Sequence, residues 1–158
     1  MDIRVATAAD IPTLERLINA AFVVERFFKV GDRITVEGIR AEQARGTFLL
    51  LERDGVPIGS VYVELRGDRG YIGMVSVDPE RQGGGYGRAL MAAAEDYCRR
   101  NGARHADLRI VNLREELRPF YRRLGYVDSG TEPFAEPAQA TQPCHFLLMT
   151  KPLAAREI

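Results

Sequence analysis

Residues 74–90 decide the fold and read MVSVDPERQGGGYGRAL. The first four residues predict a strand, which ends at Asp78 and Pro79. Four glycines then fall within residues 83–87, and Leu90 is the first apolar residue of a helical pattern. Glycine permits backbone angles and close approaches that a Cβ would forbid. The stretch therefore predicts a strand, a glycine-rich turn and a helix N-terminus in direct succession.

The predicted turn has the properties of an anion-binding site. The first N–H groups of a helix lack partners within the helix, and the positive end of the helix dipole lies beside them. Arg81 and Arg88 could add charge-assisted hydrogen bonds. These features favour a phosphate group as the ligand, while a strand–helix turn with no ligand is the structural alternative.

Two common nucleotide-binding motifs fit this turn poorly. A Walker A loop ends in Gly-Lys-Ser/Thr, where this chain has Gly87, Arg88 and Ala89. A Rossmann fingerprint that begins at Gly83 meets Arg88 at its third glycine, and one that begins at Gly85 meets a leucine. The fingerprint also normally follows the first strand of its domain, whereas several strands precede this turn.

The rest of the chain predicts an α/β (α+β) fold in the order β-α-α-β-β-β-α-β-α-β-β. Antiparallel strands come first, and the helix crossovers that follow require some parallel pairing. Gly46 is expected to end the second helix in a left-handed conformation, and residues 131–143 are expected to form a surface loop. Strands are expected at 3–6, 47–52, 58–65, 71–77, 106–111, from 126 and at 145–150, and helices at 11–22, 35–45, 90–98 and 117–124.

Three motifs in this order resemble the GNAT superfamily of acyl-CoA-dependent N-acetyltransferases. Residues 82–87, QGGGYG, are similar to its Gln/Arg-x-x-Gly-x-Gly/Ala signature. Residues 75–79, VSVDP, resemble its Val-x-Val-x-Pro strand end, and residues 120–126, FYRRLGY, resemble its Phe-Tyr-x-x-x-Gly-Phe/Tyr segment. The resemblance implies a mixed, mostly antiparallel twisted sheet of about seven strands flanked by about four helices. It also implies a single N-acetyltransferase domain over residues 1–158.

The resemblance further implies that acetyl-CoA is the acyl donor and that no metal takes part. Backbone groups of the strand would lie along the pantetheine arm, and the N–H groups of the turn would hold the diphosphate. A fixed backbone donor could stabilise the negative charge that develops on the thioester oxygen during attack by an amine. The implied cofactor-binding residues are Val75, Ser76, Val77, Gln82, Gly83, Gly84, Gly85, Tyr86, Gly87 and Arg88.

Tyr121 matches the family's tyrosine that protonates the leaving thiolate. A thiol has a reference pKa near ~8.5 and a phenol one near ~10, so a phenol can act as the proton donor. The alternative interpretation is that Tyr121 only packs with Phe120, because both belong to an apolar stripe with Leu117 and Leu124.

No residue is assigned as the base that deprotonates the amine. Tyr71, Arg109 and Arg114 stand where members of the family carry a glutamate, another base or an asparagine, and Asn112 lies nearby. The carboxylates that could lie near the acceptor are Glu25, Asp32 and Glu64, for which a solvated surface charge is the alternative interpretation.

The missing base favours an amine with a low pKa or a proton relayed through water. Freeing a lysine-like amine of pKa ~10.4 at pH 7 costs about 4.6 kcal/mol, against about 1 kcal/mol for an α-amino group near ~7.8. The expected acceptor is therefore a small molecule or an α-amino group. Residues 22–33 and 130–134 are expected to shape its pocket, with Phe27, Phe28 and Phe134 as an apolar wall or as ordinary core.

Composition excludes several other functions for the 158 residues. Basic and acidic residues number 22 each, so the charge excess that nucleic-acid or membrane-surface binding requires is missing. The two cysteines, Cys98 and Cys144, stand far apart, and neither a CxxC motif nor clustered Cys/His spacing suggests structural zinc. The N-terminus lacks a signal-peptide profile and no apolar run approaches roughly 18 residues, so a cytoplasmic location is expected. Exposed strand edges leave homodimer formation open.

Two other functions stay open at this point. A catalytically silent acyl-CoA-binding module would bind the cofactor and release no thiol when an amine is supplied. A nucleotide-binding enzyme of another fold would bind ATP or NAD and ignore coenzyme A.

Overall fold

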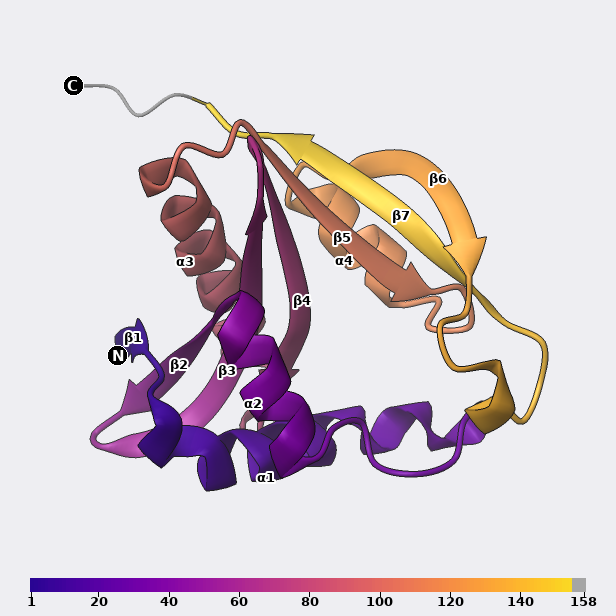
Figure 1. The fold of residues 1–158 in the computed structure, drawn as a ribbon, viewed down its shortest axis with the longest axis horizontal. Helices are drawn as coiled ribbons and strands as arrows, with labels where there is room; N and C mark the ends of the chain where they lie inside the picture. The colour runs from indigo at the N-terminus through magenta and orange to yellow at the C-terminus, as the bar shows by residue number, and fades with distance from the viewer. Residues whose placement is uncertain (155–158) are drawn as a thin grey trace.

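A seven-stranded sheet organises the chain, in a computed structural model that describes residues 1–154 (Figure 1). The strands are β1 (Asp2–Val5), β2 (Thr47–Arg53), β3 (Val56–Arg66), β4 (Arg69–Val77), β5 (His105–Val111), β6 (Val127–Pro133) and β7 (His145–Pro152). The helices are α1 (Ile11–Phe22), α2 (Val36–Arg45), α3 (Tyr86–Arg100) and α4 (Leu117–Arg123). The predicted order of elements is confirmed. The predicted domain extends to residue 158, and its last four residues lie outside the described ones.

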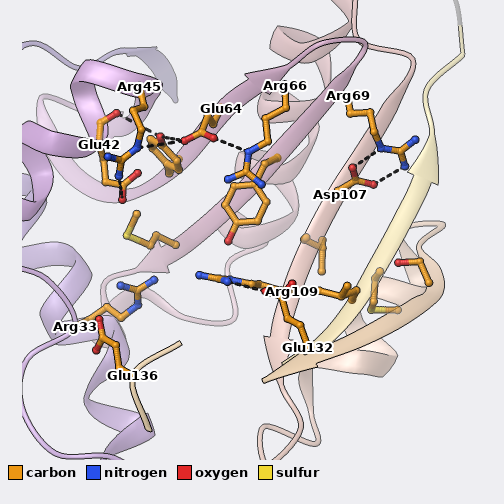
Figure 2. Close-up of a pocket in the computed structure, with 17 residues that line it drawn as sticks. Arg33, Glu42, Arg45, Glu64, Arg66, Arg69, Asp107, Arg109, Glu132 and Glu136 are labelled. Carbon is orange, nitrogen blue, oxygen red and sulfur yellow. Dashed lines mark hydrogen bonds and ion pairs between the residues drawn. The ribbon is translucent and has the colours of Figure 1, made fainter. Parts of the chain in front are cut away.

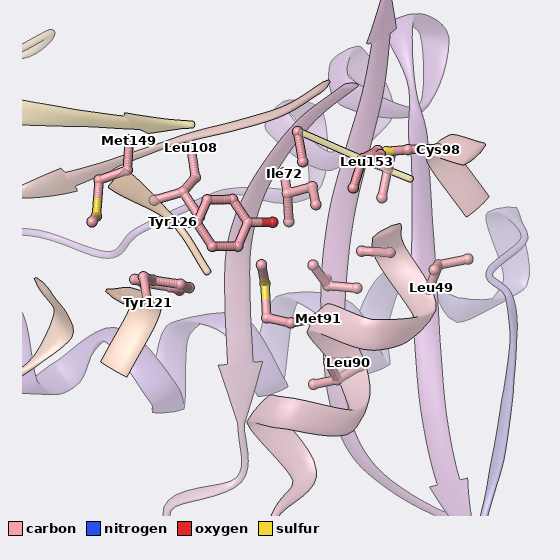
Figure 3. Packing of buried hydrophobic residues seen from close by; sticks show 14 of the residues in the cluster. Leu49, Ile72, Leu90, Met91, Cys98, Leu108, Tyr121, Tyr126, Met149 and Leu153 are labelled. Atoms are coloured by element: carbon pink, nitrogen blue, oxygen red, sulfur yellow. The ribbon is translucent and has the colours of Figure 1, made fainter. Parts of the chain in front are cut away.

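The strands lie in the order β1-β2-β3-β4-β5-β7-β6, and β4 and β5 form the parallel pair in a sheet that is otherwise antiparallel. The side chains of each strand alternate between the two faces of the sheet. Both faces therefore carry apolar side chains, and helices cover both of them. Phe48 and Leu50 of β2 pack in the cluster that holds α1, whereas Leu49 and Leu51 pack in the cluster that holds α3. Figure 3 shows this second cluster, in which Leu90 and the helix around it lie against the sheet.

The parallel pairing of β4 with β5 is short, and the place where it ends determines where the site lies. β4 and β5 pair only at Arg69↔His105, Gly70↔Ala106 and Tyr71↔Asp107. Beyond these pairs β4 continues on β3 and β5 continues on β7, so the two strands separate toward their carboxyl ends (Figure 1).

Thr7 caps a short 3-10 turn, η1 (Ala8–Asp10), that precedes α1, and the Thr7 backbone N–H donates to the Asp10 side chain at 2.7 Å. Two local expectations, those for Gly46 and for residues 131–143, are corrected. Gly46 ends α2 with φ −154°, in an extended and not a left-handed conformation. Glycine is required there for space, because a Cβ would lie 2.5 Å from the carbonyl oxygen of Val63. The predicted loop 131–143 begins as part of β6 and includes η4 (Pro137–Gln139).

Candidate active site

A cavity of about 150 Å³ lies where β4 and β5 separate. Gly73 and Val75 line it from β4, Leu108 and Ile110 from β5, and Tyr121 from α4. The end of hydrogen bonding between the two strands leaves this space open, and α4 closes one side of it. The predicted cofactor strand and the predicted acid Tyr121 therefore meet at one cavity, beside β5.

A β-bulge lies in β4 beside this cavity. Gly73 pairs with Tyr62 and Ser76 pairs with Ser60, so Met74 and Val75 both lie opposite Val61. Met74 has a φ of 50°, which is uncommon for a residue other than glycine. The Ser76 hydroxyl donates to the carbonyl oxygen of Met74 at 3.0 Å and fastens the bulge. A bulge leaves residues unpaired and redirects the strand, here at the point where β4 has left β5.

The glycine turn presents unoccupied backbone donors at the start of α3. Gly85 is the N-cap of α3 with a φ of 80°, and no side chain caps the helix. Gly83 also has a positive φ, of 88°. The first N–H groups of α3 have no carbonyl of their own helix to bind, and a Cβ on either glycine would meet no atom within 4 Å. An open turn with free donors fits a diphosphate.

The predicted cofactor residues occupy consecutive positions between the cavity and α3. Val75 lines the cavity, while Ser76 is buried within β4 and Val77 packs against the core. Asp78 follows and accepts a hydrogen bond from the Glu80 backbone at 3.0 Å, which begins the short turn η3 (Pro79–Arg81). The next predicted residues, Gln82, Gly83, Gly84, Gly85, Tyr86, Gly87 and Arg88, form the turn and the start of α3 and do not line the cavity. Their contact with a cofactor stays a prediction.

Tyr121 both packs in the core and lines the cavity. Its side chain is 7% exposed, and its ring meets that of Phe120 edge-on at 5.0 Å between centroids. Burial raises the pKa of Tyr121 to about 12, an effect that Arg114 opposes and Tyr71 reinforces. The hydroxyl therefore keeps its proton at neutral pH. Within residues 1–154 it forms no hydrogen bond, so the proton is free for a ligand.

The carboxylates expected near the acceptor occupy different environments. Glu25 is 6% exposed, and its carboxylate forms an ion pair with Arg114 with 2.9 Å between the oxygen and nitrogen atoms. The interpretation of Glu25 as a solvated surface charge is therefore wrong. Asp32 is exposed, pairs with Arg26 at 3.5 Å and does not line the cavity. Arg114 thus replaces the family's asparagine with a cation that neutralises the one buried carboxylate of the site.

A larger cleft of about 610 Å³ adjoins the cavity on the face of the sheet that carries α1 and α2. Both spaces are bordered by Arg33, Tyr71, Met74, Leu108, Arg109 and Glu136. Figure 2 shows that its charged side chains are largely paired: Arg69 with Asp107, Arg66 and Arg45 with Glu64, and Arg109 with Glu132.

Glu64 is a poor base because its carboxylate is already occupied. Tyr62 donates to it at 2.7 Å, and Arg66 forms an ion pair with it. Burial alone would raise the pKa of Glu64, but the hydrogen bonds from Arg66 and Tyr62 outweigh burial and hold the pKa below its usual value. The group stays ionised, and it lines the larger cleft but not the cavity between β4 and β5.

Tyr71 and Arg109 form a wall between the cavity and the larger cleft. The Arg109 guanidinium lies 4.2 Å from the Phe146 ring centroid, 6.0 Å from that of Tyr71 and 2.8 Å from Glu132. The positions where the family's bases were sought therefore hold an aromatic ring and a paired cation.

Only one of the three phenylalanines expected as an apolar wall lines the cavity. Phe134 does so, and Phe28 lies fully buried behind it with 6.4 Å between ring centroids. Phe27 is 53% exposed at the end of η2 (Val23–Phe27). Lys29 and Arg33 line the cavity from the expected segment 22–33 without having been singled out, and Glu136 lies outside both expected segments. They come from irregular segments whose course no periodic pattern predicts.

The described part of the chain shows neither a metal-binding cluster nor a membrane-spanning helix. Residues 1–154 contain no group of three His, Cys, Asp or Glu side chains that could hold a metal ion. None of the helices within these residues is long and apolar enough to cross a membrane. The cytoplasmic location and the homodimer stay predictions.

Comparison with known proteins places the chain in a class of acyltransferases. Residues 11–126 match the acetyltransferase (GNAT) family. The chain belongs to this family, as the three motifs predicted.

One relative is the streptothricin acetyltransferase of Streptomyces lavendulae, which is 31% identical over 119 residues. The match covers 73% of this chain and 63% of the relative, so the chain spans less than two thirds of that protein.

Two solved structures confirm the fold. The ribosomal-protein-S18-alanine N-acetyltransferase of Escherichia coli superposes with a TM-score of 0.77 at 17% identity, over 99% of this chain and 96% of that one. The Salmonella typhimurium protein yncA, solved with its cofactor acetyl-CoA, superposes with a TM-score of 0.75 at 21% identity, over 100% and 96%.

Proposed function

We propose that this protein transfers an acetyl group from acetyl-CoA to a primary amine by direct attack of the amine on the thioester. The acceptor is a small molecule or an α-amino group. The opening between β4 and β5, with Tyr121 on its wall and a glycine turn at the end of β4, carries this proposal. Family membership supports it, as does the acetyl-CoA bound to one structural neighbour.

Backbone groups hold the donor in this proposal. The N–H groups from Gln82 to Arg88 bind the diphosphate, and the positive end of the α3 dipole strengthens that contact. The backbone from Val75 to Val77 lies along the pantetheine arm. The bulge at Met74 frees backbone groups of β4 from pairing, which lets them meet the acyl oxygen where negative charge develops.

Tyr121 supplies the proton in this proposal. The thioester presents an acyl carbon that an uncharged amine attacks, and the C–S bond then breaks. The pKa of about 12 keeps a proton on the Tyr121 hydroxyl throughout the neutral range. The buried hydroxyl can donate that proton to the departing sulfur, because it has no other partner in the described chain. The proton that the attacking nitrogen loses as the amide forms returns through water to the Tyr121 oxygen.

The acceptor is inferred from what the site lacks. Glu25 is neutralised by Arg114. Glu64 is paired with Arg66 and accepts a hydrogen bond from Tyr62. With these two carboxylates occupied and no residue assigned as the base, an amine of low pKa reacts with the smallest cost of deprotonation. A relative named for streptothricin is consistent with a small-molecule acceptor.

A thiol-release assay tests the proposal. Purified protein, acetyl-CoA and a broad panel of small amines, amino acids and peptides are incubated, and free thiol is measured. Thiol release that depends on a small or α-amino acceptor is expected. Acetylation confined to internal lysines of proteins would contradict the proposed acceptor class. Coenzyme A binding without thiol release for any amine would instead identify a silent acyl-CoA-binding module.

The role of the glycine turn is tested by replacing Gly85 with alanine. Gly85 has a φ of 80°, and Gly55 in the β2–β3 hairpin has a φ of 75°; neither has an atom within 4 Å of an added Cβ. Gly85→Ala and Gly55→Ala should therefore cost similar stability, about 1 kcal/mol. Only Gly85→Ala should weaken binding of coenzyme A, by about tenfold, since it disturbs charge-assisted hydrogen bonds. Calorimetric titration measures both variants, and equal affinities would remove the turn from the binding site.

A further inference from the structure

Two basic side chains of the site have no anionic partner. Lys29 is 6% exposed and lines the smaller cavity, and its side chain forms no hydrogen bond or ion pair within residues 1–154. Arg33 lines both spaces, lies over the Phe22 ring at 5.3 Å and likewise has no ion pair within the described chain. A lysine held largely out of solvent without an ion-pair partner is costly, so its presence beside a cavity points to an anionic ligand.

The other basic side chains of the cavity are already paired. Its charged lining residues are Glu25, Lys29, Arg33, Arg109, Arg114 and Glu136. Arg114 pairs with both Glu25 and Glu116, and Arg109 pairs with Glu132 of the adjoining cleft. Lys29 and Arg33 form no ion pair within residues 1–154, although Glu25 and Glu136 act on the charge of Lys29. Among the described lining residues, Lys29 and Arg33 are therefore the cations left to bind an anion.

We propose that Lys29 and Arg33 form a carboxylate subsite, and that the acceptor is an amino acid whose carboxylate lies close to the reacting amine. This inference rests on the proposed acetyl transfer. The carboxylate binds between Lys29 and Arg33, while the amine lies toward Tyr121 and Val75 at the opening between β4 and β5.

A carboxylate fits this subsite better than a phosphate does. A carboxylate carries one negative charge, whereas a phosphate monoester carries about −1.5 to −2 at pH 7 and would be repelled more strongly by Glu25 and Glu136, which line the same cavity. The cavity of about 150 Å³ also admits only a small part of an acceptor. A side chain of the amino acid can extend into the larger cleft, past Tyr71 and Arg109.

The environment of Lys29 supports the same conclusion. Burial lowers the pKa of Lys29, and Arg33 lowers it further, while Glu25 and Glu136 act in the opposite direction. A carboxylate bound beside the ammonium would offset the loss of solvation. A bound carboxylate would therefore add to the stabilisation of the ammonium form that Glu25 and Glu136 provide.

The first experiment compares the twenty amino acids with their α-carboxamides as acceptors, with acetyl-CoA as donor. Each pair differs only in the carboxylate, and the amide has the less basic amine, so amine chemistry alone favours the amide. We expect kcat/KM to be about tenfold or more higher for the preferred acid, the size of a charge-assisted contact. Equal rates, or faster turnover of the amides, would overturn the subsite while leaving acetyl transfer intact.

The second experiment tests the role of Lys29 in binding the carboxylate of the acceptor. Lys29→Met retains the apolar stem and removes the charge, and Arg26→Met removes an exposed cation of the same segment. Lys29→Met should raise KM for the acid about tenfold and change kcat/KM for the amide less, so that the acid-to-amide ratio of kcat/KM falls. Arg26→Met should keep the wild-type ratio. An unchanged ratio in Lys29→Met would exclude Lys29 from acceptor binding, whatever its effect on stability.

A binding experiment tests the carboxylate subsite even if no amine releases thiol. The N-acetyl derivatives of the same acids and amides are titrated calorimetrically into protein saturated with coenzyme A. Tighter binding of the acid, lost in Lys29→Met, would support the subsite even though the proposed transfer had failed. Preference for aminoalkylphosphonates over acids, or acetylation of Lys29 itself detected by mass spectrometry without an acceptor, would overturn it.

Discussion

Replacement of Tyr121 with phenylalanine is expected to lower kcat about 100-fold, at the lower end of what general acid catalysis contributes. The phenylalanine ring retains the edge-on contacts with Phe120 and Tyr126, so the fold and the cavity should persist. Only the hydroxyl is lost, and in the proposed mechanism it holds the proton for the departing sulfur. KM for acetyl-CoA should stay close to the wild-type value, because the backbone of β4 and of the glycine turn binds the donor.

Steady-state thiol release at saturating acetyl-CoA and acceptor measures this effect. Tyr97→Phe is the matched control, since its hydroxyl bonds to Thr47 at 3.1 Å and lies outside the cavity. The pKa of about 12 also predicts that ionisation of Tyr121 does not limit the wild-type rate near neutral pH. If Tyr121→Phe turned over as fast as Tyr97→Phe, the tyrosine would be a packing residue alone.

Local sequence patterns predicted the framework of the site. The strand end at Asp78, the glycine turn and the start of α3 are neighbours in the chain, so their geometry follows from residue type and order. The same holds for α4, where Pro119 is tolerated in the first turn and Tyr121 follows it. These segments are short, and their hydrogen bonding is decided within a few residues.

The charged interior of the site could not be predicted in this way. Glu25 and Arg114 are 89 residues apart, and their ion pair exists only because η2 and the segment after β5 fold together. Lys29 gave no periodic signal, because it lies in an irregular segment between η2 and α2. The bulge at Met74 depends on the register with β3, which a single strand does not reveal. Tertiary pairing, and not local preference, therefore determines the electrostatics of the acceptor site.

Replacement of Arg114 with methionine is expected to lower the free energy of unfolding by about 3 kcal/mol. The side chains of Arg114 and Glu25 are 14% and 8% exposed, and their nitrogen and oxygen atoms are 2.9 Å apart. Methionine fills much of the space but leaves the Glu25 carboxylate buried without its counter-ion. Desolvation of that charge is then uncompensated, and Tm should fall by roughly 6–12 °C for a chain of this length.

A matched control separates burial from the mere loss of an arginine. Arg26→Met breaks an exposed ion pair, with side chains 59% and 64% exposed, and should change stability by no more than about 0.5 kcal/mol. The double variant Glu25→Leu/Arg114→Met removes both charges, and well-packed apolar replacements of buried pairs are often neutral. It should therefore regain most of the stability that Arg114→Met loses, as measured by urea denaturation. A double variant no more stable than Arg114→Met would mean that arginine packing, and not the unpaired carboxylate, accounts for the loss.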